Sequence, residues 1–146
     1  MKSIPLTKGK IALVSDQDHW LVKQFSWYAD QKHNMWYAQS SYVYNGKSIK
    51  IYMHRLLAGF PPFWLDHKNH NGLDNRRGNL RPATRSENQA NSRRRIKGFI
   101  RSGNKWRAVI QVNKKHINLG CFSTTKAAHA AYLRATKQYF GEFARV

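Results

Sequence analysis

The chain has 146 residues, and its 26 Lys and Arg against 7 Asp and Glu give it a formal net charge of +19. This charge indicates a polyanionic partner, because each phosphate that a cationic side chain neutralises releases counterions into solution. The sequence contains no apolar run of the length that crosses a membrane and no signal-peptide core, so we expect no membrane role. The single cysteine, Cys121, excludes an internal disulfide and a Cys-based zinc site and suits a reducing cytoplasm, where we expect the protein to work.

Residues 1–53 are predicted to form an N-terminal β-rich scaffold. Residues 4–14 and 36–54 alternate between apolar and polar side chains, which is typical of strands. Asn45-Gly46 lies between two such runs and predicts a two-residue hairpin turn, because both residue types accept positive φ. Residues 18–28 have apolar side chains at helical spacing, so a short helix packed on the hairpin is expected.

Residues 54–95 are predicted to fold as strand, turn, strand and helix. A short helix opens at His54 and ends near Gly59, and residues 63–67 then read as a strand. A polar turn leads to a returning strand at residues 79–81. Thr84 followed by Glu87 predicts a capping box for a helix that runs to about residue 94.

Four polar side chains in this segment supply the chemistry for cutting a phosphodiester. Asp66 and His67 are adjacent, Asn79 follows His67 after twelve positions, and Asn88 comes nine positions later. An imidazole with a pKa near ~6.5 accepts a proton at neutral pH. Carboxylate and amide oxygens suit Mg²⁺ or Mn²⁺. Three arginines between these residues are candidate phosphate clamps, Arg being the bidentate choice: Arg76, Arg77 and Arg81.

On these residues, positions 51–95 resemble an HNH endonuclease of the phage homing type. The matching motifs are HRL at 54–56, DH at 66–67, LDNRRGNL at 73–80 and ENQAN at 87–91. The resemblance implies a ββα-metal core at residues 54–95, in which His67 is the general base and Asp66 and Asn88 hold one divalent metal ion. It also implies that Asn79 fixes the loop, that His54 lies near the DNA backbone, and that hydrolysis leaves a 5′-phosphate and a 3′-hydroxyl.

Residues 96–146 are predicted to form a three-stranded antiparallel sheet covered on one face by a helix. Strands are expected at 98–101, 105–112 and 114–122, and a helix at 124–140 with Ala128, Ala131, Tyr132, Ala135 and Tyr139 on its inner stripe. Alternation puts Arg107 and Gln111 of the second strand, and His116 and Asn118 of the third, on the opposite face of the sheet. The fold class of the whole chain is therefore α+β.

This C-terminal segment resembles the plant ethylene-response-factor type of DNA-binding domain, through the stretches KWRAVI, INLGCFSTTKAAHAAY and GEFA. The resemblance implies DNA contact through the uncovered sheet face. Lys97 and Arg101 are what remains of the arginine-rich first strand of that family. The run Arg93-Arg94-Arg95, at the junction of the two basic segments, is expected to follow a phosphate backbone.

The sequence thus predicts a metal-dependent endonuclease that acts on double-stranded DNA with one Mg²⁺ or Mn²⁺ ion. A non-catalytic DNA-binding protein with the same fold and an RNA-directed protein are the alternatives, because basic charge does not distinguish them. A monomer that nicks one strand and a weak homodimer that cuts both strands remain open.

Overall fold

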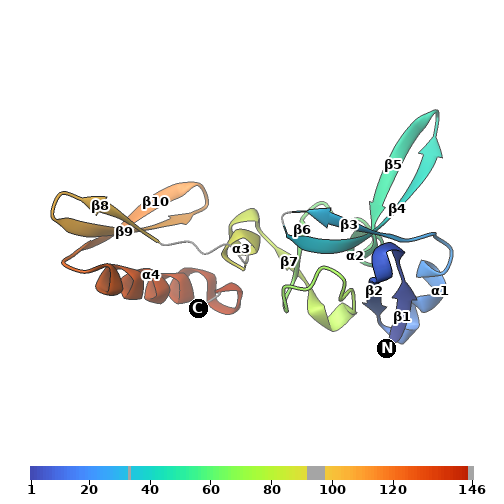
Figure 1. Ribbon diagram of the computed structural model, residues 1–146, viewed down its shortest axis with the longest axis horizontal. Helices are drawn as coiled ribbons and strands as arrows, with labels where there is room; N and C mark the ends of the chain where they lie inside the picture. Colours follow the sequence, from blue (N-terminus) through green and yellow to red (C-terminus); the bar gives the residue numbers. More distant parts are fainter. Residues whose placement is uncertain (33, 92–97, 145–146) are drawn as a thin grey trace. The chain divides into compact units, whose positions relative to one another are not determined.

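The computed structural model describes residues 1–32, 34–91 and 98–144, and these form an α+β protein with several small sheets (Figure 1). The chain divides into two compact units, Met1–Pro82 and Ala83–Val146. The boundary between the two units, after Pro82, coincides with neither of the predicted domain boundaries, which follow residue 53 and residue 95. The predicted scaffold therefore shares a unit with the first two strands of the predicted nuclease core.

The chain opens with a hairpin instead of the single strand predicted at residues 4–14. Strand β1 (Lys2–Pro5) pairs antiparallel with β2 (Ile11–Val14), and a 3-10 turn at Thr7–Gly9 separates them. Lys8 and Gly9 both adopt positive φ in this turn. The prediction was wrong because the alternation of side chains continues on either side of the reversal and hides it.

The second sheet is formed by β3 (Tyr28–Lys32), β4 (Met35–Tyr44) and β5 (Lys47–Tyr52), with β4 in the centre. The predicted hairpin is confirmed: Asn45 and Gly46 join β4 to β5 with φ of 48° and 72°. The helix predicted at residues 18–28 is shorter than expected. It consists of α1 (His19–Val22) after a 3-10 turn at Asp16–Asp18, and Tyr28 already begins β3.

The core of unit 1 lies between these two sheets and the helices. The helix α2 (Met53–Leu57) follows β5 directly and buries Met53 and Leu57. The other buried members of this cluster are Ile4, Ala12, Val14, Val22, Trp27, Ala38, Ile51 and Leu73.

The predicted order of strand, turn, strand and helix is present in the chain. Strand β6 (Trp64–His67) pairs with β7 (Leu80–Ala83), and a 3-10 turn at Arg77–Asn79 precedes β7. The helix α3 (Arg85–Ala90) follows, and its predicted capping box is confirmed: Thr84 Oγ1 accepts from Glu87 N, and Glu87 accepts from Thr84 N.

Unit 2 contains the predicted three-stranded sheet and its helix. The strands are β8 (Phe99–Ser102), β9 (Lys105–Val112) and β10 (Lys115–Phe122), in the order β10-β9-β8, and α4 (Thr125–Phe140) packs on them. Ala108, Ile110, Ala128 and Ala135 are buried between sheet and helix. One position of the predicted inner stripe is wrong: Tyr139 is exposed, and its neighbour Phe140 is buried instead.

Helix α3 belongs to unit 2. It packs against α4 and the 3-10 turn at Gly141–Phe143, and Ser86 Oγ accepts a hydrogen bond from Asn113 N after β9. Across the residues described, no helix has the length and apolar character needed to cross a membrane.

Candidate functional site

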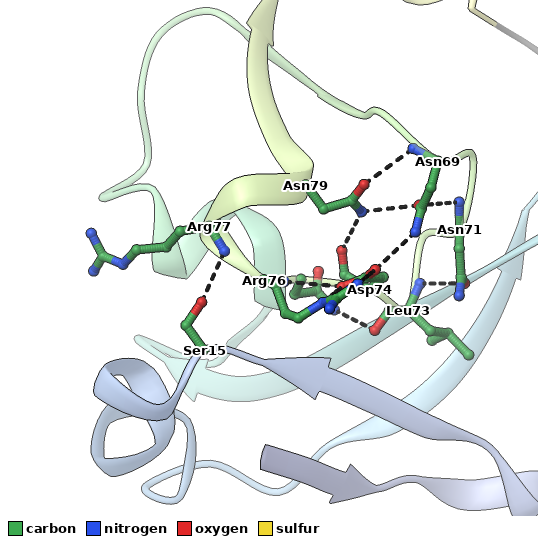
Figure 2. A network of polar contacts seen from close by, with 9 residues as sticks. Ser15, Asn69, Asn71, Leu73, Asp74, Arg76, Arg77 and Asn79 are labelled. Atoms are coloured by element: carbon green, nitrogen blue, oxygen red, sulfur yellow. Dashed lines mark hydrogen bonds and ion pairs between the residues drawn. The ribbon is translucent and has the colours of Figure 1, made fainter. Parts of the chain in front are cut away.

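Asp66 and His67 end strand β6, and both side chains are buried. The loop that follows, from Lys68 to Arg76, is polar and returns to β7 through the 3-10 turn. A polar loop with this many side-chain amides folds by satisfying its own backbone groups. Figure 2 shows the network of contacts that results.

Asn79 and Asp74 are the centres of this network (Figure 2). Asn79 Nδ2 donates to Asp74 O at 2.7 Å and to Asn69 Oδ1 at 3.0 Å, and its Oδ1 accepts from Asn69 N at 3.1 Å. The carboxylate of Asp74 accepts from Asn69 Nδ2 at 2.8 Å and from Arg76 Nε at 2.7 Å. The pKa of Asp74 lies below its usual value, chiefly because of the Arg76 guanidinium. One asparagine thus ties the start of the loop to its end.

The N-terminal hairpin holds the same loop from outside. Leu13 N donates to Leu73 O and Asn75 N donates to Leu13 O, both at 2.8 Å, so β2 and the loop make a short parallel bridge. Arg77 N donates to Ser15 Oγ at 3.1 Å (Figure 2). The predicted scaffold therefore contributes directly to the shape of the loop.

His67 faces the buried side chain of Asn75. Its Nε2 lies 3.4 Å from Asn75 Oδ1, while Asn75 Nδ2 donates to Leu73 O at 3.1 Å. Since the amide nitrogen is committed to Leu73, the oxygen faces the ring, which favours the tautomer that carries its proton on Nε2. Burial lowers the pKa of His67, and the hydrogen bond to Asn75 and the charge of Asp66 oppose this shift. The ring is therefore neutral at neutral pH.

A second histidine packs against His67. The rings of His54 and His67 are 5.1 Å apart between centroids and nearly perpendicular, and Tyr52 and Tyr37 complete the group. His54 Nδ1 is buried and has no hydrogen-bond partner within the described residues. Burial is the main cause that lowers the pKa of His54 to about 3. A neutral ring in an aromatic cluster is a poor phosphate ligand, so the position of His54 differs from the predicted place at the DNA backbone.

Asp66, the predicted metal ligand, is paired with Arg81. Arg81 Nε and Nη2 both lie 2.9 Å from Asp66 Oδ2, and both side chains are buried. A carboxylate oxygen is a suitable donor for Mg²⁺ or Mn²⁺, but an ion at Oδ2 would compete with the guanidinium. Among the residues described, no three His, Cys, Asp or Glu side chains gather to hold a metal ion. Arg81 is thus positioned to hold Asp66, not to clamp a phosphate from solvent as predicted.

The other two predicted phosphate clamps also have carboxylate partners. Arg76 directs Nε and Nη2 to Asp74, and Arg77 directs Nε and Nη2 to Asp18. Both arginine side chains remain about half exposed, at 45% and 57%, while both aspartates are buried. Each pair offsets the positive charge of its arginine, so the loop attracts phosphate less than its sequence indicates.

The remaining predicted residues lie outside unit 1 or outside the described part of the chain. Asn88, the predicted second metal ligand, lies on α3 in unit 2 and is partly exposed. The basic run Arg93-Arg94-Arg95 and Lys97 lie outside the residues that the structure describes.

The uncovered face of the sheet in unit 2 presents the predicted polar side chains. Arg107, Gln111, His116 and Asn118 are all exposed. In the strand register, Gln111 lies opposite His116 and Asn118 opposite Val109. Cross-strand partners share one face of a sheet, so these residues form one surface.

Arg101 is an exception to the prediction for this sheet. It lies opposite Trp106 in the register, whereas Ile100 lies opposite Arg107. Arg101 therefore lies on the side of the sheet that carries Trp106, opposite to the side that carries Arg107. Its exposed side chain does not add to the predicted DNA-binding face.

Several residues of the loop and its surroundings were missed from the sequence. Asp74 and Asn75 were interpreted as turn residues, yet they position Arg76 and His67. Their acceptors and donors come from strand β2 and from the other end of the loop, and spacing along the sequence does not reveal such partners. Tyr37 and Tyr52 carried no signal at all, because aromatic residues in alternating strands are ordinary core or surface residues.

Comparison of the chain with models of known protein families, with curated proteins and with solved structures found no match.

Proposed function

We propose that this chain is a metal-dependent endonuclease of the HNH type that hydrolyses DNA. The observation that carries the proposal is the position of His67. It ends β6 next to Asp66, its ring is neutral and oriented by Asn75, and Asn79 braces the loop that follows. An oriented and unprotonated imidazole can take a proton from a water molecule that comes within hydrogen-bond reach.

In this mechanism His67 accepts the proton of the attacking water through Nδ1. The tautomer favoured by Asn75 leaves the lone pair on that nitrogen. The carboxylate of Asp66 stabilises the imidazolium, and its ion pair with Arg81 fixes the end of the strand. The lowered pKa makes His67 a weaker base than a free histidine but keeps the ring unprotonated at neutral pH.

One Mg²⁺ or Mn²⁺ ion would supply charge neutralisation at the phosphate. Asp66 provides an oxygen donor of the kind that such ions prefer, and Asn88, the other ligand that the sequence predicts, belongs to unit 2. The sheet face with Arg107 and Gln111 is the proposed DNA-binding surface of unit 2, since Arg and Gln read base edges in a major groove.

The test is cleavage of supercoiled plasmid in the presence of Mg²⁺ or Mn²⁺, with an EDTA control. Replacement His67→Ala should slow nicking by ~10²–10⁴, the usual worth of a general base. His19→Ala is the matched control, because the His19 side chain on α1 makes none of the described hydrogen bonds of the loop, and its removal should leave the rate unchanged. Equal rates for wild type and His67→Ala, or no cleavage with any metal, would exclude the proposal.

The ion pair of Asp66 with Arg81 favours a second candidate, a DNA-binding protein without catalytic activity. A buried carboxylate that is neutralised by a guanidinium stabilises a fold without any metal. Gel shifts on several DNA sequences that are equal for wild type and His67→Ala, with no cutting by either protein, would support this candidate.

A further inference from the structure

The segment between α2 and β6 exposes three large aromatic side chains close together in the sequence. Phe60 is 53% exposed, Phe63 46% and Trp64 57%. Single exposed apolar residues are ordinary on a protein surface, but a cluster of large ones marks a binding surface. We call these three residues the aromatic loop.

The aromatic loop is held in a fixed conformation. Arg55 Nη1 donates to Phe63 O at 2.8 Å and Nη2 donates to Pro61 O at 2.6 Å, so one guanidinium binds two carbonyls of the loop. Phe60 N donates to Arg55 O at 2.8 Å, and Pro61 is buried. The exposed rings are therefore presented by an ordered backbone.

Phe60 gives a second sign that the conformation is selected. Its φ is 53°, in the left-handed region that bulky residues rarely adopt, and it follows Gly59 at 72°. Such a conformation costs free energy, and it persists where the surroundings or a function require it. The side chain of Phe60 is exposed and contributes little to the core, so packing of the core does not explain this conformation.

The aromatic loop ends a stretch of sequence without acidic residues, and this charge indicates the kind of partner. From Gln31 to Leu65 the sequence contains Lys32, Lys47, Lys50 and Arg55 but no Asp or Glu. A partner that is anionic and also offers flat apolar surfaces is a nucleic acid, whose bases stack on aromatic side chains beside a neutralised backbone.

Trp64 also connects the aromatic loop to the proposed active site. It is the first residue of β6, and Asp66 and His67 end the same strand. Residues two apart in a strand lie on the same face and about 7 Å apart, so Trp64 lies on the side of Asp66. This distance corresponds to about two nucleotide steps of 3.4 Å along one DNA strand.

We propose that the aromatic loop, with Trp64 as its main contact, stacks on bases that are unstacked from the duplex next to the phosphate to be cut. The inference rests on the proposed function in taking DNA as the partner. Apolar wedges that open base steps are a known way for proteins to deform DNA, and the unstacking of the bases costs free energy. In a DNA bubble the bases are already unpaired and unstacked. The protein should therefore bind a bubble more tightly than a paired duplex.

The experiment compares the affinities of the full-length protein for two labelled DNA molecules of equal length, one fully paired and one with a central unpaired bubble. Fluorescence anisotropy in EDTA keeps cleavage out of the measurement. Because both molecules carry the same number of phosphates, the ratio of the two dissociation constants largely cancels the electrostatic contribution to binding. Wild type should prefer the bubble.

Trp64→Ala should reduce the affinity for the bubble by roughly 5- to 150-fold, the worth of stacking one base, and leave the affinity for paired DNA nearly unchanged. Trp64→Phe should retain most of the preference, and Trp64→Leu, which is apolar but has no ring, should lose it. Trp20→Ala is the matched control, because Trp20 is 67% exposed in the same unit but lies on α1 beside Asp16 and Asp18.

The inference is overturned if wild type binds both molecules equally, if Trp64→Ala and Trp64→Leu keep the preference, or if Trp20→Ala loses it to the same extent. Sedimentation velocity supplies one more outcome that overturns the inference. If wild type is a dimer, and Trp64→Ala dissociates it without changing the ratio of the two dissociation constants for DNA, the aromatic loop is a surface between copies of this chain. Plasmid nicking with Mg²⁺ is scored separately. A preference that depends on Trp64 in a protein that never cuts would support this inference and exclude the proposed nuclease.

Discussion

Acidification should destabilise unit 1 because of the buried pair of His54 and His67. The pKa of His54 is about 3 in the folded chain, whereas an unfolded histidine titrates near ~6.5. Between these two values the unfolded chain binds a proton that the folded chain excludes. The free energy of unfolding therefore rises with pH through this window, and the stability present at neutral pH is lost as the pH falls below ~6.5.

The magnitude follows from the width of the window. At about pH 5 the unfolded histidine is protonated and the folded one is not, a difference of about 1.5 pH units at ~1.4 kcal/mol each, so His54 alone should cost about 2 kcal/mol. His67 has a lowered pKa as well and adds in the same direction. Asp74 has its pKa lowered too, so its contribution is lost below the usual carboxylate pKa, in a more acidic range.

The assay is urea denaturation at several pH values between about 5 and 7.5, followed by tryptophan fluorescence, since Trp27 lies in the core of unit 1. His54→Phe keeps an aromatic ring in the cluster and removes the titration. In this variant the free energy of unfolding should fall less steeply as the pH is lowered, and the remaining fall should be the part due to His67. His116→Gln is the control, because His116 is exposed. An unchanged pH dependence in His54→Phe would refute the argument from burial.

Three other changes test the loop and the sheet face. Asn79→Ala removes three hydrogen bonds within the loop and should lower the free energy of unfolding by about 1–3 kcal/mol; an unchanged denaturation midpoint would contradict the bracing role. Gly72→Ala would bring a Cβ to 2.5 Å from Trp36 O and should cost about 1–3 kcal/mol, seen as a lower melting temperature. Arg107→Ala should weaken DNA binding and reduce the salt dependence by about one ion, while Arg101→Ala, on the other side of the sheet, should do so less. Equal effects in binding assays at several salt concentrations would show that both faces are used.

Local signals in the sequence predicted the local structure well. The Asn45-Gly46 turn, the capping box of α3 and the sheet and helix of unit 2 are all present. Each depends on residues close together in the chain, whose backbone preferences are strong enough to fix the conformation. The turn at Lys8-Gly9 was missed because a lysine gives no signal for positive φ.

The partners of the charged side chains were not predictable in the same way. The spacing of Asp66, His67 and Asn79 indicated a site, but the pairing of Arg81 with Asp66 and of Arg77 with Asp18 depends on the packing of distant segments. A run of arginines suggests an open basic surface when it is considered alone. In the fold, buried carboxylates lie next to these arginines, so part of the positive charge is neutralised within the protein.

The contacts from the first hairpin to the loop after β6 have a consequence for the order in which the site forms during synthesis. Leu13, Ser15 and Asp18 hold residues about sixty positions further along the chain. Everything that shapes the surroundings of His67 in unit 1 has left the ribosome once Pro82 has emerged, before unit 2 itself emerges. The first eighteen residues are accordingly an integral part of unit 1, and an affinity tag or truncation that disturbs them should impair the loop after β6 as surely as a substitution inside it.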